Sequence, residues 1–206
     1  MTEKIKTALS KIYHASLGSL LCAVHHLLND KRPIEEKTLL VVAHPDDDTL
    51  FFHTVLKNEK PFVALMTTGK SLRRMKEFRR AMKYYGVNYT FFPLHSRDER
   101  ENLLLKNVKL VLSRGKFERV YTHGESGEYG HVMHRRVHKA VTAAFSGEIY
   151  TPVTETENAL LPPLSRKTVL EKEKIFKEIY RTQIFVLEMW QNWLCREKHV
   201  KHEVKK

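Results

Sequence analysis

Short apolar runs alternate with longer amphipathic segments along most of this chain. Runs of this length predict strands, and five of them lie at residues 39–43, 62–66, 87–94, 120–122 and 149–153. The first run is apolar without interruption, which is typical of a strand buried on both faces of a sheet. Strands joined by crossover helices form a mainly parallel sheet covered by helices on both faces. The pattern therefore predicts a Rossmann-like α/β fold with the strand order 3-2-1-4-5.

The segments between these strands carry the signals of helix ends. Ser71 has the character of an N-cap for a basic helix that runs to residue 85, and Gly86 is suited to end that helix. A second helix is predicted over about residues 97–114, and a third runs from His131 to about residue 145. The second, third and fourth predicted strands are therefore each followed by a helix, as the crossovers of a parallel sheet require.

The remaining amphipathic segments complete a single domain over residues 1–206. Apolar residues at helical spacing predict an N-terminal helix over residues 3–29 and a long C-terminal helix over about residues 169–197. We expect four consecutive parts: an N-terminal helix and linker, an α/β core, a loop with the C-terminal helix, and a solvated basic tail, over residues 1–36, 37–153, 154–199 and 200–206.

A polar cluster follows the first predicted strand. Pro45 ends the strand because it lacks a backbone N–H, and His44 and three aspartates, Asp46, Asp47 and Asp48, surround it. Placing such groups at the end of a buried strand costs free energy unless they bind something, and imidazole and carboxylate are both good zinc ligands. Aspartates that only cap the next helix are the alternative, which accounts for one or two of the carboxylates but leaves His44 unexplained.

A second polar cluster follows the fourth predicted strand, in the stretch VYTHGESGEYGHVMHRRVH over residues 120–138. His131 and His134 are three residues apart at the start of a helix, so their side chains share one face, and His138 continues that face. Strands 1 and 4 are neighbours in the predicted order, and a crevice opens beyond their carboxyl ends. We therefore expect the two clusters to face each other across that crevice.

The two clusters together resemble the signature of the LmbE-like, or PIG-L, family of zinc-dependent de-N-acetylases. HPDDD at residues 44–48 and GEYGHxxH at residues 127–134 are similar to its two motifs. The helix between them fits the family spacing R-x-x-E-x-x-x-A-x-x-x-x-G, at Arg74, Glu77, Ala81 and Gly86. The resemblance covers residues 37–185, and the chain departs from it at Asp48, where the family usually has Glu.

The resemblance implies a ligand set for a catalytic metal. His44, Asp47 and His134 would bind zinc and leave one position open for water, as a catalytic zinc requires. A set of two histidines and one carboxylate also suits iron(II) or another divalent metal. His131 could replace His134 as the ligand, although the resemblance favours His134.

The resemblance also implies roles for the residues around the metal. Asp46 would be the general base, and His131, as an imidazolium, would stabilise the oxyanion. Arg74 and Tyr129 would contact the substrate.

Each of these roles has an alternative reading. Arg74 could instead pair with Glu77 on its own helix, and Tyr129 could only pack. Asp48 could orient His44 or cap the helix, and His138 is more typical of a buried or outer-sphere histidine than of a ligand.

The net charge of +12, from 36 Lys+Arg against 24 Asp+Glu, changes the expected partner. Basic residues are spread through every helix and no nucleic-acid module with interleaved aromatic residues occurs, which argues against nucleic acid. An anionic substrate carrier or an anionic membrane surface would account for the charge equally well. The net charge therefore indicates only that the partner is negatively charged.

Two cysteines and the N-terminal segment bear on location. Cys22 and Cys195 lie far apart and form no disulfide framework, so we expect a reducing, cytoplasmic environment. The predicted N-terminal helix is short for a membrane span and lacks a cleavage site, which favours packing on the domain. Its lysines keep peripheral contact with an anionic bilayer as an alternative.

The sequence thus predicts a zinc-dependent hydrolase that removes the N-acetyl group from an N-acetylglucosamine-type sugar or its conjugate. The carrier could be a glycan, a lipid or a nucleotide. A zinc amidohydrolase that acts on a non-sugar N-acyl substrate is one alternative, because the pocket walls rather than the metal select the substrate. A non-catalytic module that binds anions or nucleic acid is another.

Overall fold

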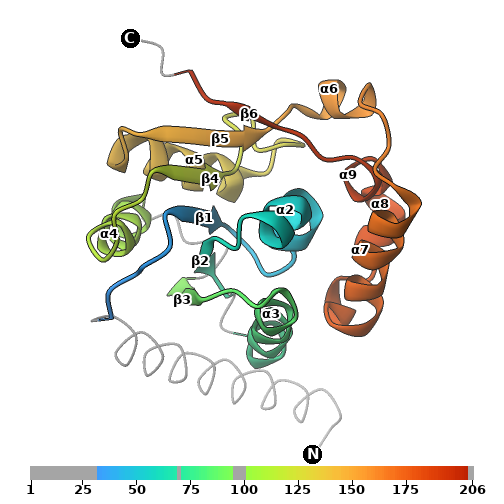
Figure 1. Ribbon diagram of the computed structural model, residues 1–206, viewed down its shortest axis with the longest axis horizontal. Coiled ribbons are helices and arrows are strands. Elements are labelled where there is room, and N and C mark those ends of the chain that lie inside the picture. The colour runs from blue at the N-terminus through green and yellow to red at the C-terminus, as the bar shows by residue number, and fades with distance from the viewer. Residues whose placement is uncertain (1–31, 69–70, 95–100, 204–206) are drawn as a thin grey trace, which may run out of the picture.

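The computed structural model describes residues 32–68, 71–94 and 101–203, which contain one six-stranded sheet (Figure 1). Its order is β3-β2-β1-β4-β5-β6, which confirms the predicted order of the first five strands. The strands are β1 (Thr38–Val42), β2 (Phe62–Thr67), β3 (Tyr89–Leu94), β4 (Arg119–Thr122), β5 (Glu148–Pro152) and β6 (His199–Lys201). All pairs are parallel except β5 with β6. The predicted N-terminal helix lies outside the described residues.

Helices cover both faces of the sheet, as the pattern predicts (Figure 1). One face carries α2 (Asp47–Asn58), α3 (Leu72–Tyr85) and α7 (Arg166–Glu178). The other carries α4 (Glu101–Leu112) and α5 (Val132–Ala144). Successive residues of β1 serve opposite faces: Leu40 and Val42 pack toward the first helix layer, whereas Leu39 packs toward the second. β1 is therefore buried on both sides, which fixes the loop that follows it.

The ends of α3 follow the predicted signals. The Ser71 hydroxyl accepts a hydrogen bond from the backbone N–H of Arg74 at 3.4 Å and caps the helix. Gly86 closes it in the left-handed conformation, with φ of 65°. These two ends place Arg74 in the first turn, at the edge of the sheet where the parallel strands end.

The prediction of one long C-terminal helix over residues 169–197 is wrong. After α7 the chain forms a short 3-10 turn and two short helices, η1 (Arg181–Gln183), α8 (Val186–Met189) and α9 (Gln191–Cys195). Side chains of other elements draw the backbone out of the helical path. The Tyr180 hydroxyl donates to Asp48 at 2.6 Å, and the Glu77 carboxylate accepts from both the N–H and the hydroxyl of Thr182. Tertiary contacts thus override the helical periodicity.

The prediction of a solvated tail after residue 199 is also wrong for the first residues of that tail. His199–Lys201 forms β6, which pairs with β5 through Thr151 opposite Val200. The predicted loop before α7 contains a further short helix, α6 (Glu155–Ala159), with a capping box between Thr154 and Glu157. An alternating strand of three residues is too short to be recognised from its pattern.

Glu197 fastens the segment before β6 to α2. Its Oε1 atom accepts from the N–H of Thr54 at 2.8 Å, and its Oε2 atom lies 3.4 Å from Nζ of Lys172. Lys172 is fully buried and also donates to the carbonyls of Leu50 and Trp193. None of the helices in the described part of the chain combines the length and apolar character that a membrane span requires.

Candidate active site and metal centre

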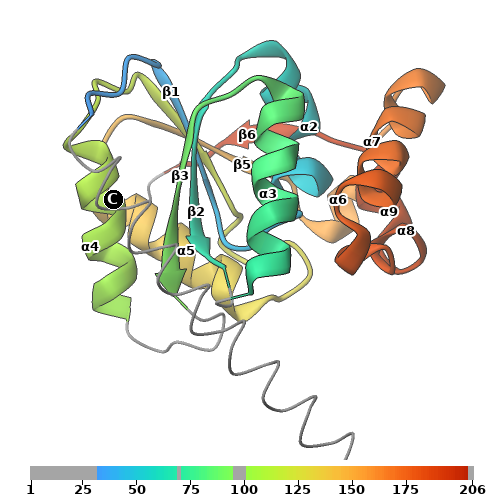
Figure 2. The same cartoon turned by 90° about the horizontal axis from the view of Figure 1, so that it is seen from below.

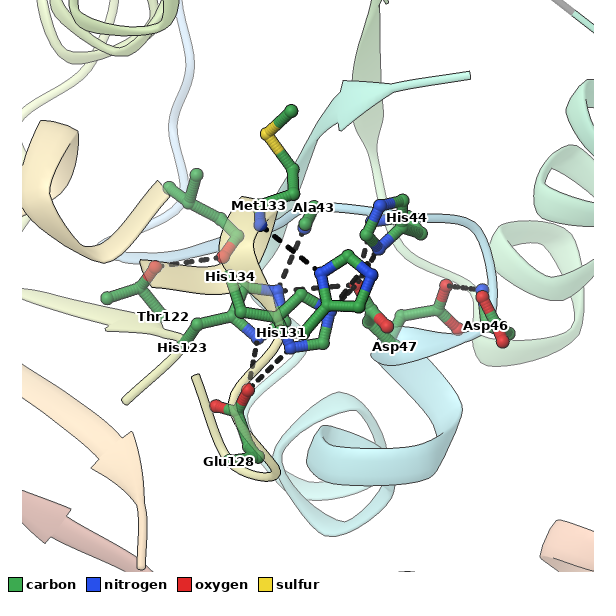
Figure 3. A network of polar contacts seen from close by, with 12 residues as sticks. Ala43, His44, Asp46, Asp47, Thr122, His123, Glu128, His131, Met133 and His134 are labelled. Atoms are coloured by element: carbon green, nitrogen blue, oxygen red, sulfur yellow. Dashed lines mark hydrogen bonds and ion pairs between the residues drawn. The ribbon is translucent and has the colours of Figure 1, made fainter. Parts of the chain in front are cut away.

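The two polar clusters predicted from the sequence meet at the carboxyl ends of β1 and β4. These strands are parallel neighbours, with Val41 opposite Thr122. The loop after β1 therefore lies beside the loop after β4, and Figure 3 shows His44 and Asp47 turned toward His131 and His134. Residues about 90 positions apart in the chain are in direct contact here, since His44 and His134 are hydrogen-bond neighbours.

Three ligand-type atoms form a nearly regular triangle. Nδ1 of His44, Oδ2 of Asp47 and Nε2 of His134 lie 3.3 Å apart in each of the three pairs. A tetrahedral zinc ion with ligand distances of about 2.0–2.1 Å has ligands about 3.3–3.4 Å apart. All three side chains are buried. The triangle therefore fits one face of a tetrahedral metal site. Two overlapping groups that share His134 also have metal-ligand spacing, His44 with His131 and Asp47 with His123, so this cluster is able to bind a metal.

Glu128 orients His134 from the other side of the ring. Its Oε2 atom lies 2.6 Å from Nδ1 of His134, and its Oε1 atom accepts from the N–H of Gly124 at 2.7 Å. Burial alone would lower the pKa of His134, but Asp47 and Glu128 outweigh burial and raise it to about 10. A carboxylate on the second nitrogen of a ligating histidine fixes its tautomer and leaves the first nitrogen to the metal. Glu128 is the acidic residue of the GEYGHxxH motif, and its spacing alone indicates no role for it.

His123 belongs to the same cluster and was not assigned from the sequence. Its Nε2 atom accepts a hydrogen bond from the N–H of Ala43 at 2.9 Å, and its Nδ1 atom lies 3.2 Å from Glu128. Nε2 also lies 3.3 Å from Asp47, so His123, Asp47 and His134 form a second group with metal-ligand spacing. Because the Nε2 lone pair is already engaged by a backbone donor, His123 supports the ligands rather than joining them.

His131 is the N-cap of α5 rather than part of its first turn. Its Nδ1 atom accepts from the N–H of Met133 at 3.2 Å, so the proton of the neutral ring lies on Nε2. Burial, with His134 and His44 nearby, lowers the pKa of His131 to about 4. The lowered pKa and the contact with Met133 both favour a neutral imidazole that donates from Nε2, in place of the expected imidazolium.

Asp46 adopts a strained backbone conformation for a residue with a side chain, with φ of 109°. Arg74 stabilises it from α3: Nη2 donates to Oδ1 of Asp46 at 3.0 Å and to the carbonyl of Pro45 at 2.8 Å. Burial, and then the charge of Asp47, raise the pKa of Asp46 well above its usual range, against the opposing effect of Arg74. Arg74 thus contacts the expected base, and the alternative pairing with Glu77 is made by Arg73 at 3.7 Å.

Asp48 contacts the backbone of Asp46 and not His44. Its Oδ2 atom accepts from the N–H of Asp46 at 3.3 Å and from the hydroxyl of Tyr180 at 2.6 Å. His138 lies behind the site, where its Nδ1 atom contacts the carbonyl of His123 at 2.8 Å. Both residues therefore stabilise the loops that carry the site.

A cavity of about 320 Å³ opens next to the triangle. One side is polar and contains His44, Asp46, Asp47, Arg74 and His131. The other is formed by Leu50 of α2, by Tyr129 and by the C-terminal segment, through Gln183, Phe185, Val186, Met189 and Trp190. Tyr129 stacks on Trp190 with ring centroids 3.9 Å apart, so this wall is mostly apolar and largely aromatic. The cavity brings six of the seven predicted site residues to one surface, and His134 lies just beneath it.

Comparisons with known proteins agree with this geometry. The profile of the PIG-L family, described as GlcNAc-PI de-N-acetylase, matches residues 39–145. A relative from Acanthamoeba polyphaga mimivirus, uncharacterized protein L374, is 24% identical over 169 residues, which cover 69% of this chain and 75% of that protein. The crystal structure of GalB, the 4-carboxy-2-hydroxymuconate hydratase of Pseudomonas putida KT2440, superposes with a TM-score of 0.57. It covers 76% of this chain and 82% of that one at 16% identity, and so shows a shared fold.

The family match spans both polar clusters and the helix between them. It includes every predicted ligand, the expected base and the neutral imidazole of His131. Together with the buried His/Asp group, it supports a de-N-acetylase-type hydrolase. The chain belongs to the PIG-L family.

Proposed function

We propose that this protein is a zinc-dependent de-N-acetylase that hydrolyses the acetamide of an N-acetylglucosamine-type sugar or its conjugate. The carboxylate of Asp46 beside the triangle of His44, Asp47 and His134 carries this proposal, because metal-assisted amide hydrolysis uses a base next to the metal to activate water. The family description supports the acetamide as the bond that is broken.

His44, Asp47 and His134 would hold the zinc. When bound, zinc polarises an amide carbonyl and lowers the pKa of water, which is the chemistry this reaction needs. The same donors also suit iron(II), so the identity of the metal as zinc is part of the proposal. Glu128 and His123 keep His134 and Asp47 in position.

Asp46 performs the proton transfers in the proposed reaction. Its carboxylate takes a proton from the attacking water, whose oxygen forms a bond to the acetamide carbon. The carbon–nitrogen bond then breaks, Asp46 delivers the proton to the departing nitrogen, and acetate and a free amine result. A pKa raised by burial suits a group that must both take and release this proton.

His131 and Arg74 assist from opposite sides. The Nε2–H of neutral His131 faces the cavity and would donate to the carbonyl oxygen as it gains negative charge; a donor of this type is typically worth about 3 kcal/mol. Arg74 holds Asp46 in its strained conformation through two contacts on one side-chain nitrogen.

The cavity walls support a sugar conjugate as the substrate. Polar groups line the side that faces the triangle, and the stacked pair of Tyr129 and Trp190 gives the other side a flat apolar surface. The hydratase activity of GalB belongs to that protein, and a fold shared at 16% identity does not transfer it.

Acetate release from a panel of N-acetylglucosamine conjugates tests the proposal. Zinc-loaded protein should release acetate, whereas chelated protein and Asp46→Asn should not, and Asp46→Asn should still bind one zinc. Full activity of Asp46→Asn would contradict the role of the base. Zinc bound without acetate release across the panel would contradict the sugar substrate and leave the metal site standing.

A further inference from the structure

Three large apolar side chains stand exposed beside the mouth of the cavity. Ile184, Phe185 and Met189 are 51%, 47% and 63% exposed. Phe185 and Met189 also line the cavity, and a backbone hydrogen bond from Met189 to Phe185 places them on one face of α8. We call these three residues the apolar rim. No part of the described chain covers it, although the same short helix buries Val186 in the core.

Every exposed charged residue of α3, the helix beside this rim, is basic. Its exposed charged positions are Arg73, Lys76, Arg79, Arg80 and Lys83, which we call the basic face. The only acidic residue of α3, Glu77, is 5% exposed and points inward to Thr182. Glu77 also forms an ion pair with Arg73 at 3.7 Å, and α3 has no further acidic side chain to offset the other four cations of the basic face.

The apolar rim and the basic face form one continuous surface. Nη2 of Arg80 donates to the carbonyl of Glu178, the last residue of α7 and three residues before η1, at 3.2 Å. Glu77 of α3 accepts from Thr182 of η1, so the two elements are in direct contact. Figure 2 shows α3 and the α7–α9 segment on the same side of the sheet. In the segment from η1 to α8, Arg181 adds a further exposed cation and Glu188 is the one acidic residue.

We propose that this surface docks the protein on an anionic membrane, with the apolar rim inserted between headgroups. Exposed apolar side chains flanked by lysine and arginine are the features that hold proteins in the interface of an anionic bilayer. A nucleic acid would use the basic face but would leave the apolar rim in water, and a neutral protein partner would leave the cations uncompensated. The cavity would then open toward molecules carried in the membrane.

Vesicle binding by the full chain tests this surface independently of any enzymatic activity. The probe is sedimentation with vesicles of pure phosphatidylcholine and with vesicles that contain phosphatidylserine as well. The wild-type protein should bind the anionic vesicles much more tightly than the neutral ones. Arg79→Glu with Lys83→Glu should weaken this binding by more than about tenfold, because each cation near the surface contributes about a fivefold factor.

The apolar rim has matched controls in the same chain. Ile184→Asp with Met189→Asp should also abolish most of the binding to anionic vesicles. Leu160→Asp with Leu170→Asp changes two side chains that are 83% and 52% exposed, just after α6 and on α7, outside the apolar rim. This variant should lose much less binding to anionic vesicles. Lys106→Glu with Lys109→Glu on α4 serves as the matched charge control, because α4 covers the opposite face of the sheet.

Three results would overturn the proposal. Equal binding to neutral and anionic vesicles would do so, as would no binding to either. Wild-type binding by both surface variants, with circular dichroism showing that they are folded, would show that another part of the chain meets the membrane. Failure of acetate release in the activity panel would leave the docking result unaffected, because vesicle binding requires no turnover.

Discussion

Nδ1 of His134 lies 2.6 Å from the carboxylate of Glu128, while Nε2 of the same ring faces Asp47 at 3.3 Å. The ring is thus held between two carboxylates, one from each side. Because Nδ1–H donates to Glu128, the neutral ring presents the lone pair of Nε2 at the position a metal would occupy. Glu128 has a positive φ of 56°, so the loop itself is bent to deliver this contact.

Glu128→Gln should weaken zinc binding about 10–100-fold without unfolding the protein, because it removes the charge behind His134 and keeps the size of the side chain. The measurement is competition for zinc against a chelator of known affinity. Glu125→Gln is the matched control, since Glu125 is three residues away in the same loop and exposed. Equal affinity in both variants would remove Glu128 from the metal site.

Arg74→Gln should lower kcat for acetate release by about tenfold or more while the zinc content stays at the wild-type value. The guanidinium holds both Asp46 and the carbonyl of Pro45, so its loss frees the strained base to move. Arg73→Gln is the neighbouring control, because Arg73 is exposed and pairs only with Glu77 at 3.7 Å. A change in KM alone would instead assign Arg74 to substrate binding.

Tyr180→Phe should lower the free energy of unfolding by about 1–3 kcal/mol, since it removes the donor at 2.6 Å from the buried carboxylate of Asp48. Chemical denaturation monitored by tryptophan fluorescence measures this difference. Tyr84→Phe removes a hydroxyl that contacts Glu171 from a ring that is 44% exposed, and should cost no more than about 0.5 kcal/mol. Equal costs for the two variants would show that Asp48 does not depend on Tyr180.

His53 should make the protein less stable as the pH falls from 6.5 toward 4. Burial, and then the charge of Lys172, lower its pKa from the usual 6.5 to about 4 in the folded protein. In this range the unfolded chain binds a proton at His53 that the folded protein does not, so stability is lost as the pH decreases.

The variant His53→Gln isolates this effect. Its free energy of unfolding should fall less than that of the wild-type protein between pH 7 and pH 5. At pH 7.5 both side chains are neutral, so the difference there measures only the lost contact with Tyr85 at 2.8 Å. Parallel pH dependences of the two proteins would contradict the assignment.

The sequence was sufficient to predict the core of the fold and the proximity of the two polar clusters. Unbroken apolar strands and helix caps are local signals, and the strand order follows from parallel crossover rules. His44 and His134 could be brought together because each comes directly after a strand whose neighbour the topology predicts.

Features that depend on distant partners could not be predicted. Lys172 has the position of a surface residue on an amphipathic helix, yet it is fully buried because Glu197 and two carbonyls meet it there. The breaks after α7 and the short strand β6 likewise depend on contacts with Asp48, Glu77 and β5. The neutral state of His131 depends on burial and on two neighbouring histidines that no spacing rule reveals.

The attachment of Glu197 to Thr54 bears on how this polypeptide tolerates shortening. A variant that stops before Glu197 keeps every predicted ligand and every residue that lines the cavity. It loses the anchor on α2 and the pairing of β6 with β5, which together hold the C-terminal wall against the metal-binding loops. The presence of the two signature motifs therefore does not by itself show that such a chain is active, because residues beyond both motifs maintain the shape of the cavity between them.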